Sequence, residues 1–494
     1  MEPRPTFDIL EQRLRDVSLE MDAEAMRRAG YRVVDWLIDR QAGMRASPLG
    51  RELKREETER LLREPMPEDA SSFDHVFEEY TAKVAPNAVP LDHPRFFAFI
   101  PSAPNFVAVL ADALVAGTNV FAGTWLESSG PSQVEIVVLD WFKQMLGLPL
   151  AAGGVLVSGG SVANLTALAA ARRAILNDDT ARAAVYYSDQ THASVDRALR
   201  VLGFRDAQIR RLGTGTDFRL DIAALREAIA RDRANGMRPF AVVGNAGTTN
   251  TGAVDQLGEI AGVARREGLW FHVDAAYGGF AALTERGRRQ IAGIEQADSV
   301  VLDPHKWFYC PFEVGCVLVR EASRLRETFR ILPDYMRDVV REEREINFCD
   351  YGVQLTRSFR ALKVWMTVKT FGARRLREVI DQCLDLAEYG AQLFARSPRI
   401  EILAAPQLAV FAFRYLPERI PAAGREAFLN RLNERLQDRI IAGRELMISS
   451  TQLGERFVLR FCVLNHRTRR EDVRDALRLI LDYGREVERD MASA

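Results

Sequence analysis

The sequence predicts an α/β fold with a large, mostly parallel sheet, a helical segment before it and a small α+β domain after it. Between residues 91 and 370, short apolar runs alternate with helical patterns, which is typical of the strand–helix units of a parallel sheet. The residues on either side lack that alternation. The chain has 494 residues, 47% of them hydrophobic, and is long enough for two or three domains with substantial cores.

Composition and charge exclude several classes of protein. The net charge of −1 gives no basic field that would indicate nucleic acid or an anionic membrane as a partner. The apolar run VAVLADALVAG is interrupted by Asp112, so no uncharged stretch reaches the roughly 18 residues that a membrane-spanning helix needs. The first residues carry charges where a signal peptide needs an apolar segment. The five cysteines form no CxxC pair, which favours reduced thiols and a cytoplasmic location over disulfides or a zinc ribbon.

Residues 1–90 are predicted to form charged amphipathic helices separated by proline and serine. The stretch AMRRAGYRVVDWLIDRQAG places Tyr31, Val34, Leu37 and Ile38 at helical spacing. So many charges and so few core residues suggest that this segment packs on something else, and a partner subunit is one option.

Residues 91–370 form the predicted large domain. Many of the polar residues discussed below follow an apolar run, and in parallel sheets ligands bind at the carboxyl ends of the strands. The strand-like runs are GGVLVSGG, AAVYYSD, PFAVVGNAG, LWFHVDAA, DSVVLDP and GCVLVR. The helical stretches between them are SVANLTALAAARRAIL, HASVDRALRVLG, DIAALREAIARDRANG and QLGEIAGVARREG.

Residues 371–494 have the pattern of a smaller α+β domain. A helical stretch, REVIDQCLDLAEYGAQLFA, precedes the strand-like runs LAVFAFRYL and RFVLRFCVL, and the helical stretch REDVRDALRLILDYGREVERD ends the chain. No solenoid repeat or low-complexity tract occurs anywhere in the chain.

Lysine is scarce, which shortens the search for a reactive amine. Of 67 basic residues only six are lysines. Lys306 directly follows the apolar run SVVL and a turn forced by Pro304. A strand-end amine is partly desolvated, which favours its neutral, nucleophilic form, whereas the alternative is a structural lysine that caps a loop. The other five have ordinary surface interpretations in charged or amphipathic helices: Lys54, Lys83, Lys143, Lys363 and Lys369.

Asp274 ends a second apolar run, LWFHVDAAYGGF, and small residues follow it. Small side chains beside a buried carboxylate leave room for a flat ligand, and a buried carboxylate needs a cation or donor as partner. A structural aspartate that caps the next turn is the alternative. His272 and Asp274 could ligate a metal, but no third His or Cys lies nearby in the sequence, so no metal is predicted.

Three further polar elements complete the pattern. Gly159, Gly160 and Ser161 precede an alanine-rich helix whose free N–H groups and dipole could bind phosphate, although such a sequence also makes an ordinary capped turn. His192 opens a helix after a strand and could stack on a flat ring or pass protons, although a lone His there is more often structural. Thr248 and its neighbour Thr249 end another strand and could donate hydrogen bonds.

Together these elements match the needs of pyridoxal phosphate. Its aldehyde needs a lysine, its pyridine nitrogen needs an acid partner, and its phosphate needs backbone donors. Lys306 follows Asp274 by 32 residues, and the glycine element and His192 precede both.

The sequence resembles the group II pyridoxal-phosphate decarboxylases, and among them those that act on aromatic amino acids. The motifs that carry the resemblance are HPRFFAFIPSA, SDQTHASVDRA, HVDAAYGG, DPHKW and RSFRALKVW. The resemblance runs over nearly the whole chain and implies pyridoxal-phosphate fold type I. It also implies a homodimer with active sites at the interface, in which residues 1–90 wrap the partner.

The resemblance implies roles for individual residues. Lys306 would bond the cofactor's aldehyde, Asp274 would pair with the pyridine nitrogen, and His192 would stack on the ring opposite Ala276. Tyr335, on a charged loop, would deliver the proton that replaces the carboxylate. The implied cofactor-binding set is Gly160, Ser161, Thr248, Asp274, Ala276, Asp303, His305 and Lys306, and the implied substrate-binding set is Phe99, Pro101, Ser102 and His192.

One departure from the family pattern concerns the phosphate. Asp303 stands where the animal enzymes have Asn, and an Asp has no donor for phosphate and adds like charge. A direct contact is therefore doubtful, and backbone amides could bind the phosphate instead.

Decarboxylation of an aromatic L-amino acid is the expected reaction, and other activities stay open. In related aldehyde synthases, which also oxidise the amine, the loop tyrosine or the stacking histidine is commonly replaced, and this chain retains Tyr335 and His192. An acidic amino-acid decarboxylase would share every cofactor motif, but the apolar residues around Phe99 favour an aromatic substrate. A cofactor-free paralogue would have lost Lys306 or Asp274.

Overall fold

The computed structural model describes residues 4–15, 17–50, 52–100, 103–331 and 345–493. These residues fall into two compact units, Met1–Val89 and Pro90–Ala494. The predicted boundary near residue 90 lies at the junction of the two units, whereas the two domains predicted after it lie in one unit. The division between those two domains stays a prediction.

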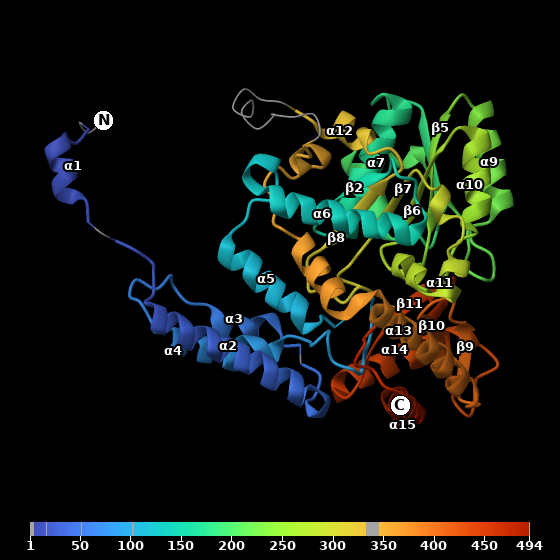
Figure 1. Cartoon of the computed structure of the whole chain (residues 1–494). Coiled ribbons are helices and arrows are strands. Elements are labelled where there is room, and N and C mark those ends of the chain that lie inside the picture. The colour runs from blue at the N-terminus through green and yellow to red at the C-terminus, as the bar shows by residue number, and fades with distance from the viewer. Residues whose placement is uncertain (1–3, 16, 51, 101–102, 332–344, 494) are drawn as a thin grey trace. The chain divides into compact units, whose positions relative to one another are not determined.

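The first unit consists of one long helix and several short ones, and α3 and α4 lie beside the long helix α2 (Figure 1). Asp22 begins the long helix, because its side chain accepts a hydrogen bond from the backbone N–H of Ala25 at 2.7 Å. Arg32 bonds Asp74 and Glu78, and so ties this helix to the last α-helix of the unit. None of the residues in the four α-helices is buried. The helices are α1 (Phe7–Arg13), α2 (Ala23–Gly43), α3 (Arg55–Leu62) and α4 (Phe73–Glu79), with η1 (Met44–Ala46), η2 (Tyr80–Val84) and η3 (Ala85–Asn87).

The second unit contains a seven-stranded, mostly parallel sheet, as predicted. Its strand order is β2-β8-β7-β6-β5-β3-β4, and only β8 runs against its neighbours. The strands are β2 (Gly153–Val157), β3 (Ala183–Ser188), β4 (Ile209–Leu212), β5 (Arg238–Asn245), β6 (Trp270–Asp274), β7 (Ser299–Leu302) and β8 (Gly315–Val319). All six predicted strands are confirmed. Strand β4 was not predicted, because its sequence, IRRL, has two arginines where an edge strand meets solvent.

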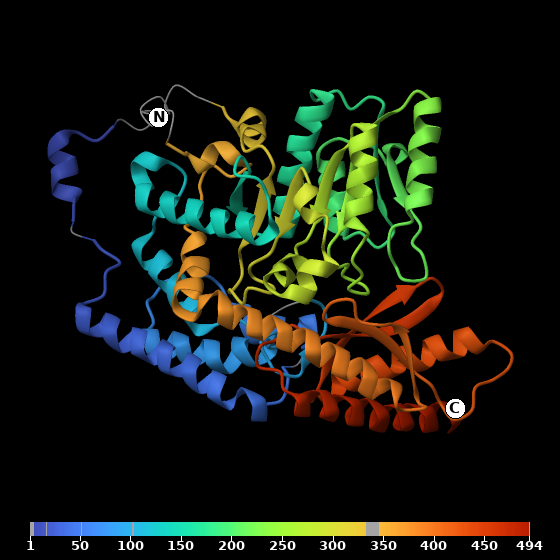
Figure 2. The same ribbon diagram turned by 45° about the vertical axis from the view of Figure 1, so that its right-hand side comes forward.

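Helices flank this sheet, and α7 crosses it in contact with β5 to β8 (Figures 1 and 2). Its middle is rich in fully buried alanines, whose small side chains let the helix approach the sheet closely. The helices and short helices of this part are α5 (Phe106–Thr118), α6 (Trp125–Leu146), α7 (Gly160–Leu176), α8 (Ala193–Val201), η4 (Asp206–Gln208), α9 (Ile222–Ala234), α10 (Leu257–Glu267), η5 (Gly278–Leu283), α11 (Glu285–Gln290), η6 (Ile294–Gln296), α12 (Ser323–Phe329) and η8 (Phe348–Tyr351).

A second sheet of five strands follows, with the order β1-β11-β12-β10-β9. Its strands are β1 (Phe96–Phe97), β9 (Ile400–Ala404), β10 (Val410–Tyr415), β11 (Met447–Leu453) and β12 (Arg456–Cys462). Strand β1 pairs in parallel with β11, and the ring of Phe97 stacks on that of Phe461 at 4.0 Å. The helices around this sheet, α13 (Ala361–Ala395), α14 (Arg425–Gly443) and α15 (Arg470–Ser493), pack against one another (Figure 2).

The predicted boundary at residues 370 and 371 falls inside α13. Directly after this boundary, Gly372 has a φ of 72° and interrupts the helix. The predicted helix that holds Lys363 and Lys369 and the predicted helical stretch after residue 371 therefore form one interrupted element that crosses the predicted boundary.

One lysine differs from its predicted surface position. Lys363 on α13 is only 4% exposed, and its Nζ donates to Asp112 on α5 at 2.8 Å. The surface interpretation is therefore wrong for Lys363, because Asp112 supplies a partner from a distant part of the sequence. In the described part of the chain, no helix is both long and apolar enough to cross a bilayer.

Candidate active site

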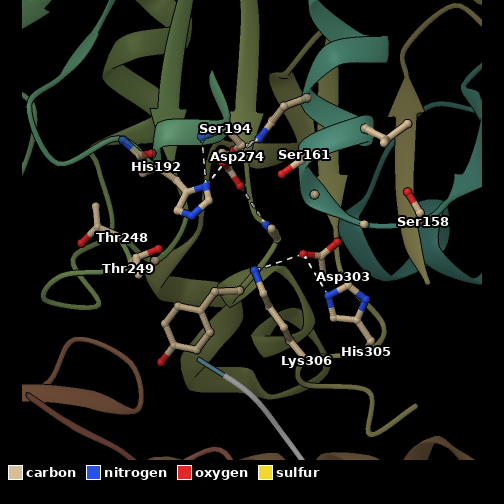
Figure 3. A pocket seen from close by; sticks show the side chains of 18 residues that line it. Ser158, Ser161, His192, Ser194, Thr248, Thr249, Asp274, Asp303, His305 and Lys306 are labelled. Atoms are coloured by element: carbon tan, nitrogen blue, oxygen red, sulfur yellow. Dashed lines mark hydrogen bonds and ion pairs between the residues drawn. The ribbon is translucent and has the colours of Figure 1, made fainter. Parts of the chain in front are cut away.

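A cavity of about 260 Å³ lies at the carboxyl edge of the seven-stranded sheet (Figure 3). Strands β2, β3, β5, β6 and β7 all run toward this edge, so the residues after them meet there. The sequence-predicted residues that line the cavity are Gly160, Ser161, His192, Thr248, Asp274, Ala276, Asp303, His305 and Lys306.

His192, one of the predicted substrate-binding residues, lines this cavity. Phe99 does not line it, and its side chain is 57% exposed. Pro101, Ser102 and Tyr335 lie outside the described residues. The roles of these four residues stay predictions.

Lys306 enters the cavity from the turn that follows β7. Its backbone N–H donates to the carbonyl of Asp303 at 2.8 Å, which closes the turn. Its Nζ lies 3.0 Å from Oδ2 of Asp303, and the side chain is 24% exposed. The only lysine in the cavity lining is thus held at a strand end, half-buried, beside a carboxylate.

Asp303 is buried between two basic side chains. Its Oδ2 also lies 3.5 Å from Nε2 of His305, whose Nδ1 accepts a hydrogen bond from the N–H of Val314. Burial by itself would raise the pKa of Asp303, but the combined attraction of Lys306 and His305 outweighs it and holds that pKa below its usual value. Its Oδ1 is buried without a hydrogen-bond partner among the described residues.

The N-terminus of α7 forms a glycine-lined cradle. The N–H groups of Gly160, Ser161 and Val162 have no hydrogen-bond partner within the described residues, as expected for the first turn of a helix. A Cβ at Gly160 would lie 2.9 Å from Oδ2 of Asp303, and one at Gly159 would lie 3.1 Å from the ring of His305. Only glycine leaves this space open for a group that the N–H donors and the helix dipole attract.

Asp274, at the end of β6, is 8% exposed and held by two donors. Oδ1 accepts from the N–H of Ala276 at 3.2 Å, and Oδ2 accepts from Nδ2 of Asn164 at 3.0 Å. Each carboxylate oxygen therefore has a hydrogen-bond donor. An anionic acceptor in a cavity lined by small residues suits a protonated ring nitrogen.

His192 and Thr248 line the cavity from neighbouring loops. His192 is the N-cap of α8, and its Nδ1 accepts from the N–H of Ser194 at 3.2 Å. The Thr248 hydroxyl contacts that of Thr251 at 3.0 Å and accepts from the N–H of Ala253, so it shapes its own turn.

The structure gives His272 a role that the sequence did not indicate. Both ring nitrogens are engaged at 2.8 Å, Nδ1 with Ser299 and Nε2 with Asn164. Burial lowers the pKa of His272 to about 4, although Asp274 pulls it upward. Within the described ranges, no group of three or more His, Cys, Asp or Glu side chains is placed to hold a metal ion.

Asn164 and Ser194 also line the cavity and were missed by sequence reasoning. The available signal was a single amide in the otherwise small and apolar helix VANLTALAAA, since a buried amide needs partners. The sequence does not show which partners the fold supplies.

The residues present fit pyridoxal phosphate. The cradle offers free N–H donors for a phosphate, Asp274 offers an acceptor for a ring nitrogen, and Lys306 offers a primary amine. All three lie in one cavity, on three different elements (Figure 3).

Comparison with known proteins agrees with this geometry. The pyridoxal-dependent decarboxylase conserved domain matches residues 56–416. An aromatic-L-amino-acid decarboxylase of Bacillus atrophaeus is 41% identical over 471 residues, which cover 95% of this chain and 98% of the relative. A phenylacetaldehyde synthase of Arabidopsis thaliana is 30% identical over 473 residues, which cover 93% of this chain and 96% of the relative.

A solved structure has the same fold. The crystal structure of Oryza sativa TDC with PLP and tryptamine has a TM-score of 0.90 and 32% identity, and the match covers 96% of this chain and 100% of that one. The chain therefore belongs to the pyridoxal-dependent decarboxylase family, whose cofactor is pyridoxal phosphate.

Proposed function

We propose that this enzyme decarboxylates an aromatic L-amino acid to the corresponding arylalkylamine and carbon dioxide. The observation that carries the proposal is the meeting of Lys306, Asp274, His192 and the α7 cradle in one cavity. The similarity to an aromatic-L-amino-acid decarboxylase supports the substrate class.

The proposed chemistry divides between the cofactor and the chain. Pyridoxal phosphate supplies an aldehyde that bonds amines and a protonated ring that withdraws electrons from the bond to the departing carboxylate. Lys306 would hold the cofactor through its Nζ. Asp274 accepts a hydrogen bond from the ring nitrogen and so keeps that nitrogen protonated.

The remaining side chains orient the reactants. The N–H groups at the start of α7 bind the phosphate, with Ser161 and His305 beside them. His192 covers one face of the ring, while Ala276 leaves room on the other. We propose that Tyr335 delivers the proton that takes the place of the lost carboxylate, and that Ser102 binds on the carboxylate side of the substrate.

The segment at Phe99 and Ile100 supports an aromatic substrate. This segment is apolar, whereas an acidic side chain would call for basic residues.

The test is carbon dioxide and amine release by the cofactor-loaded enzyme with phenylalanine, tyrosine, dopa, tryptophan, glutamate and aspartate. We expect turnover of at least one aromatic substrate and none of the acidic ones. Lys306→Ala should lower turnover by several orders of magnitude, because no other lysine lines the cavity. Selective turnover of glutamate, or an active Lys306→Ala variant, would refute the proposal.

An aldehyde synthase is the second candidate, favoured by the similarity to the Arabidopsis thaliana phenylacetaldehyde synthase. That activity consumes oxygen and releases aldehyde, ammonia and peroxide. We expect amine without peroxide or ammonia, because His192 and Tyr335 are both present. Equal amounts of ammonia and carbon dioxide would instead establish the synthase.

We further propose that the enzyme is a cytoplasmic homodimer. Support for a dimer comes from the exposed apolar side chains of the first unit, which include Phe7, Leu14 and Leu19. Support for a reducing compartment comes from the five cysteines, all of them free and buried.

A further inference from the structure

Asn164 is a buried amide on α7 that connects two functional side chains of the cavity. Its side chain is inaccessible to solvent. Nδ2 donates to Oδ2 of Asp274 at 3.0 Å and to Oγ of Ser194 at 2.9 Å, while Oδ1 lies 2.8 Å from Nε2 of His272. Both amide hydrogens and the amide oxygen are therefore used.

The hydrogen-bond pattern fixes the orientation of this amide. A carboxylate only accepts, so the amide NH₂ must face Asp274 and the amide oxygen must face His272. His272 therefore carries its proton on Nε2. On the other side of the His272 ring, the Ser299 oxygen accepts a hydrogen bond from the indole N–H of Trp270 at 2.8 Å. The hydroxyl hydrogen of Ser299 is therefore left to bond Nδ1 of His272. The network is complete with His272 neutral.

The second amide hydrogen acts on His192 through Ser194. Because the Ser194 oxygen accepts from Asn164, its own hydrogen is directed to Nδ1 of His192 at 2.7 Å. The backbone N–H of Ser194 donates to the same nitrogen. With two donors on Nδ1, the neutral ring carries its proton on Nε2, the nitrogen on the cavity side (Figure 3).

We propose that Asn164 is a positioning residue that acts on two groups at once, because it donates one hydrogen bond to the carboxylate of Asp274 and, through Ser194, fixes His192 as the Nε2–H tautomer. This inference rests on the proposed roles of Asp274 and His192. The other titratable groups that line the cavity are Tyr277, Lys306, His305 and Asp303. The last three form their own cluster after β7. Asn164 alone links the β6 carboxylate to the α8 histidine within the described network.

Asn164→Leu tests the proposal, because leucine has a similar size and no hydrogen-bonding group. We expect pyridoxal phosphate to bind the variant roughly ten- to a hundredfold more weakly, since Asp274 loses a donor to its charged form. Nitrogen-15 spectra of histidine-labelled, cofactor-free protein should show His192 as the Nε2–H tautomer in the unchanged protein and as a mixture in the variant. The chain has only six histidines, and His192→Gln assigns the signal.

Thr166→Val is the matched control. Thr166 is equally buried on the same helix, but its hydroxyl bonds only the carbonyl of Val162 and it does not line the cavity. We expect this variant to keep both the cofactor affinity and the His192 tautomer. Equal effects of Asn164→Leu and Thr166→Val would mean that Asn164 acts only through helix stability, and would overturn the proposal.

Ser194→Ala provides a second measurement should Asn164→Leu fail to fold. It removes the hydroxyl donor to Nδ1 of His192 and keeps only the weaker backbone donor at 3.2 Å, so the population of the Nδ1–H tautomer should rise while cofactor affinity changes less than about threefold. An unchanged tautomer in Ser194→Ala would refute the proposal. Because these spectra need neither cofactor nor substrate, they are independent of whether the enzyme releases carbon dioxide.

Discussion

At the scale of the residue, the cavity places a carboxylate beside the group that is expected to bind a phosphate. Asp303 is 2% exposed, and it faces Lys306 at 3.0 Å and the space above Gly160. The doubt that the sequence raised about a direct contact between Asp303 and phosphate therefore has a physical basis in the fold.

Asp303→Asn is predicted to tighten cofactor binding severalfold. The substitution removes a negative charge that faces the phosphate dianion in a region of low solvent exposure, where charge repulsion is poorly screened. Titration of cofactor-free protein with pyridoxal phosphate, followed by absorbance, measures the dissociation constant. Pyridoxal without phosphate should show a smaller change.

Asp298→Asn serves as the control for this substitution. Asp298 lies at the opposite end of β7 and accepts from the N–H of Phe271 at 2.8 Å. Removing its charge should leave cofactor affinity unchanged. Weaker binding by Asp303→Asn would show instead that the carboxylate itself holds the cofactor site together.

His272 is predicted to make the stability of the protein depend on pH between about 6.5 and 4. Its pKa is about 4 in the folded protein, so the unfolded chain binds a proton in this window and the folded chain does not. Stability is thus complete above pH 6.5 and falls as the pH falls toward 4, by at most about 3 kcal/mol for this group. His466, whose burial also lowers its pKa to about 4, acts in the same window.

Thermal unfolding of the cofactor-free protein at pH 7 and pH 5 measures this effect. His272→Asn should unfold at a lower temperature at both pH values, but its midpoint should change less between them than that of the unchanged protein. A variant with the same pH dependence as the unchanged protein would argue against a neutral His272.

At the scale of the element, the first turn of α7 is predicted to bind the phosphate. Gly160→Ala is predicted to weaken pyridoxal phosphate binding by about tenfold or more, because the new Cβ would lie 2.9 Å from Asp303 and 3.3 Å from Cβ of Ala276. The cofactor titration described above checks this. Gly258→Ala, in the first turn of α10, has no atom within 4 Å of its Cβ and should leave affinity unchanged while slightly raising thermal stability. Equal affinity of Gly160→Ala and the unchanged protein would place the phosphate elsewhere.

At the scale of the whole molecule, the proposed homodimer predicts a particle of twice the chain mass of 55.5 kDa. The first unit buries none of the residues of its four α-helices, and three of its side chains, Leu14, Val17 and Leu19, are 79% to 103% exposed. Such apolar exposure is unstable in a lone subunit. Analytical ultracentrifugation from nanomolar to micromolar protein should give the dimer mass throughout. A monomer that remains active at all concentrations would contradict the proposal.

The sequence alone determined the layout of the fold and most of the cavity lining. Short apolar runs identify buried parallel strands, because both faces of such strands are covered. The polar residue that ends each run then lies at one edge of the sheet, which is why Lys306, Asp274 and His192 could be found without coordinates. The short edge strands β4 and β1 were not predicted, because neither has the length or the apolar run that the pattern requires.

Only the tertiary structure decided which side chains meet. Lys363 is buried because Asp112, 251 residues earlier in the chain, supplies its partner. Asn164 joins Asp274, 110 residues later, to Ser194 and thus to His192. Hydrogen bonds and ion pairs depend on distances of about 3 Å between atoms that a sequence pattern places only on a strand, a helix or an edge. The sequence could therefore name the reactive groups, whereas the positions of their protons follow only from the packed structure.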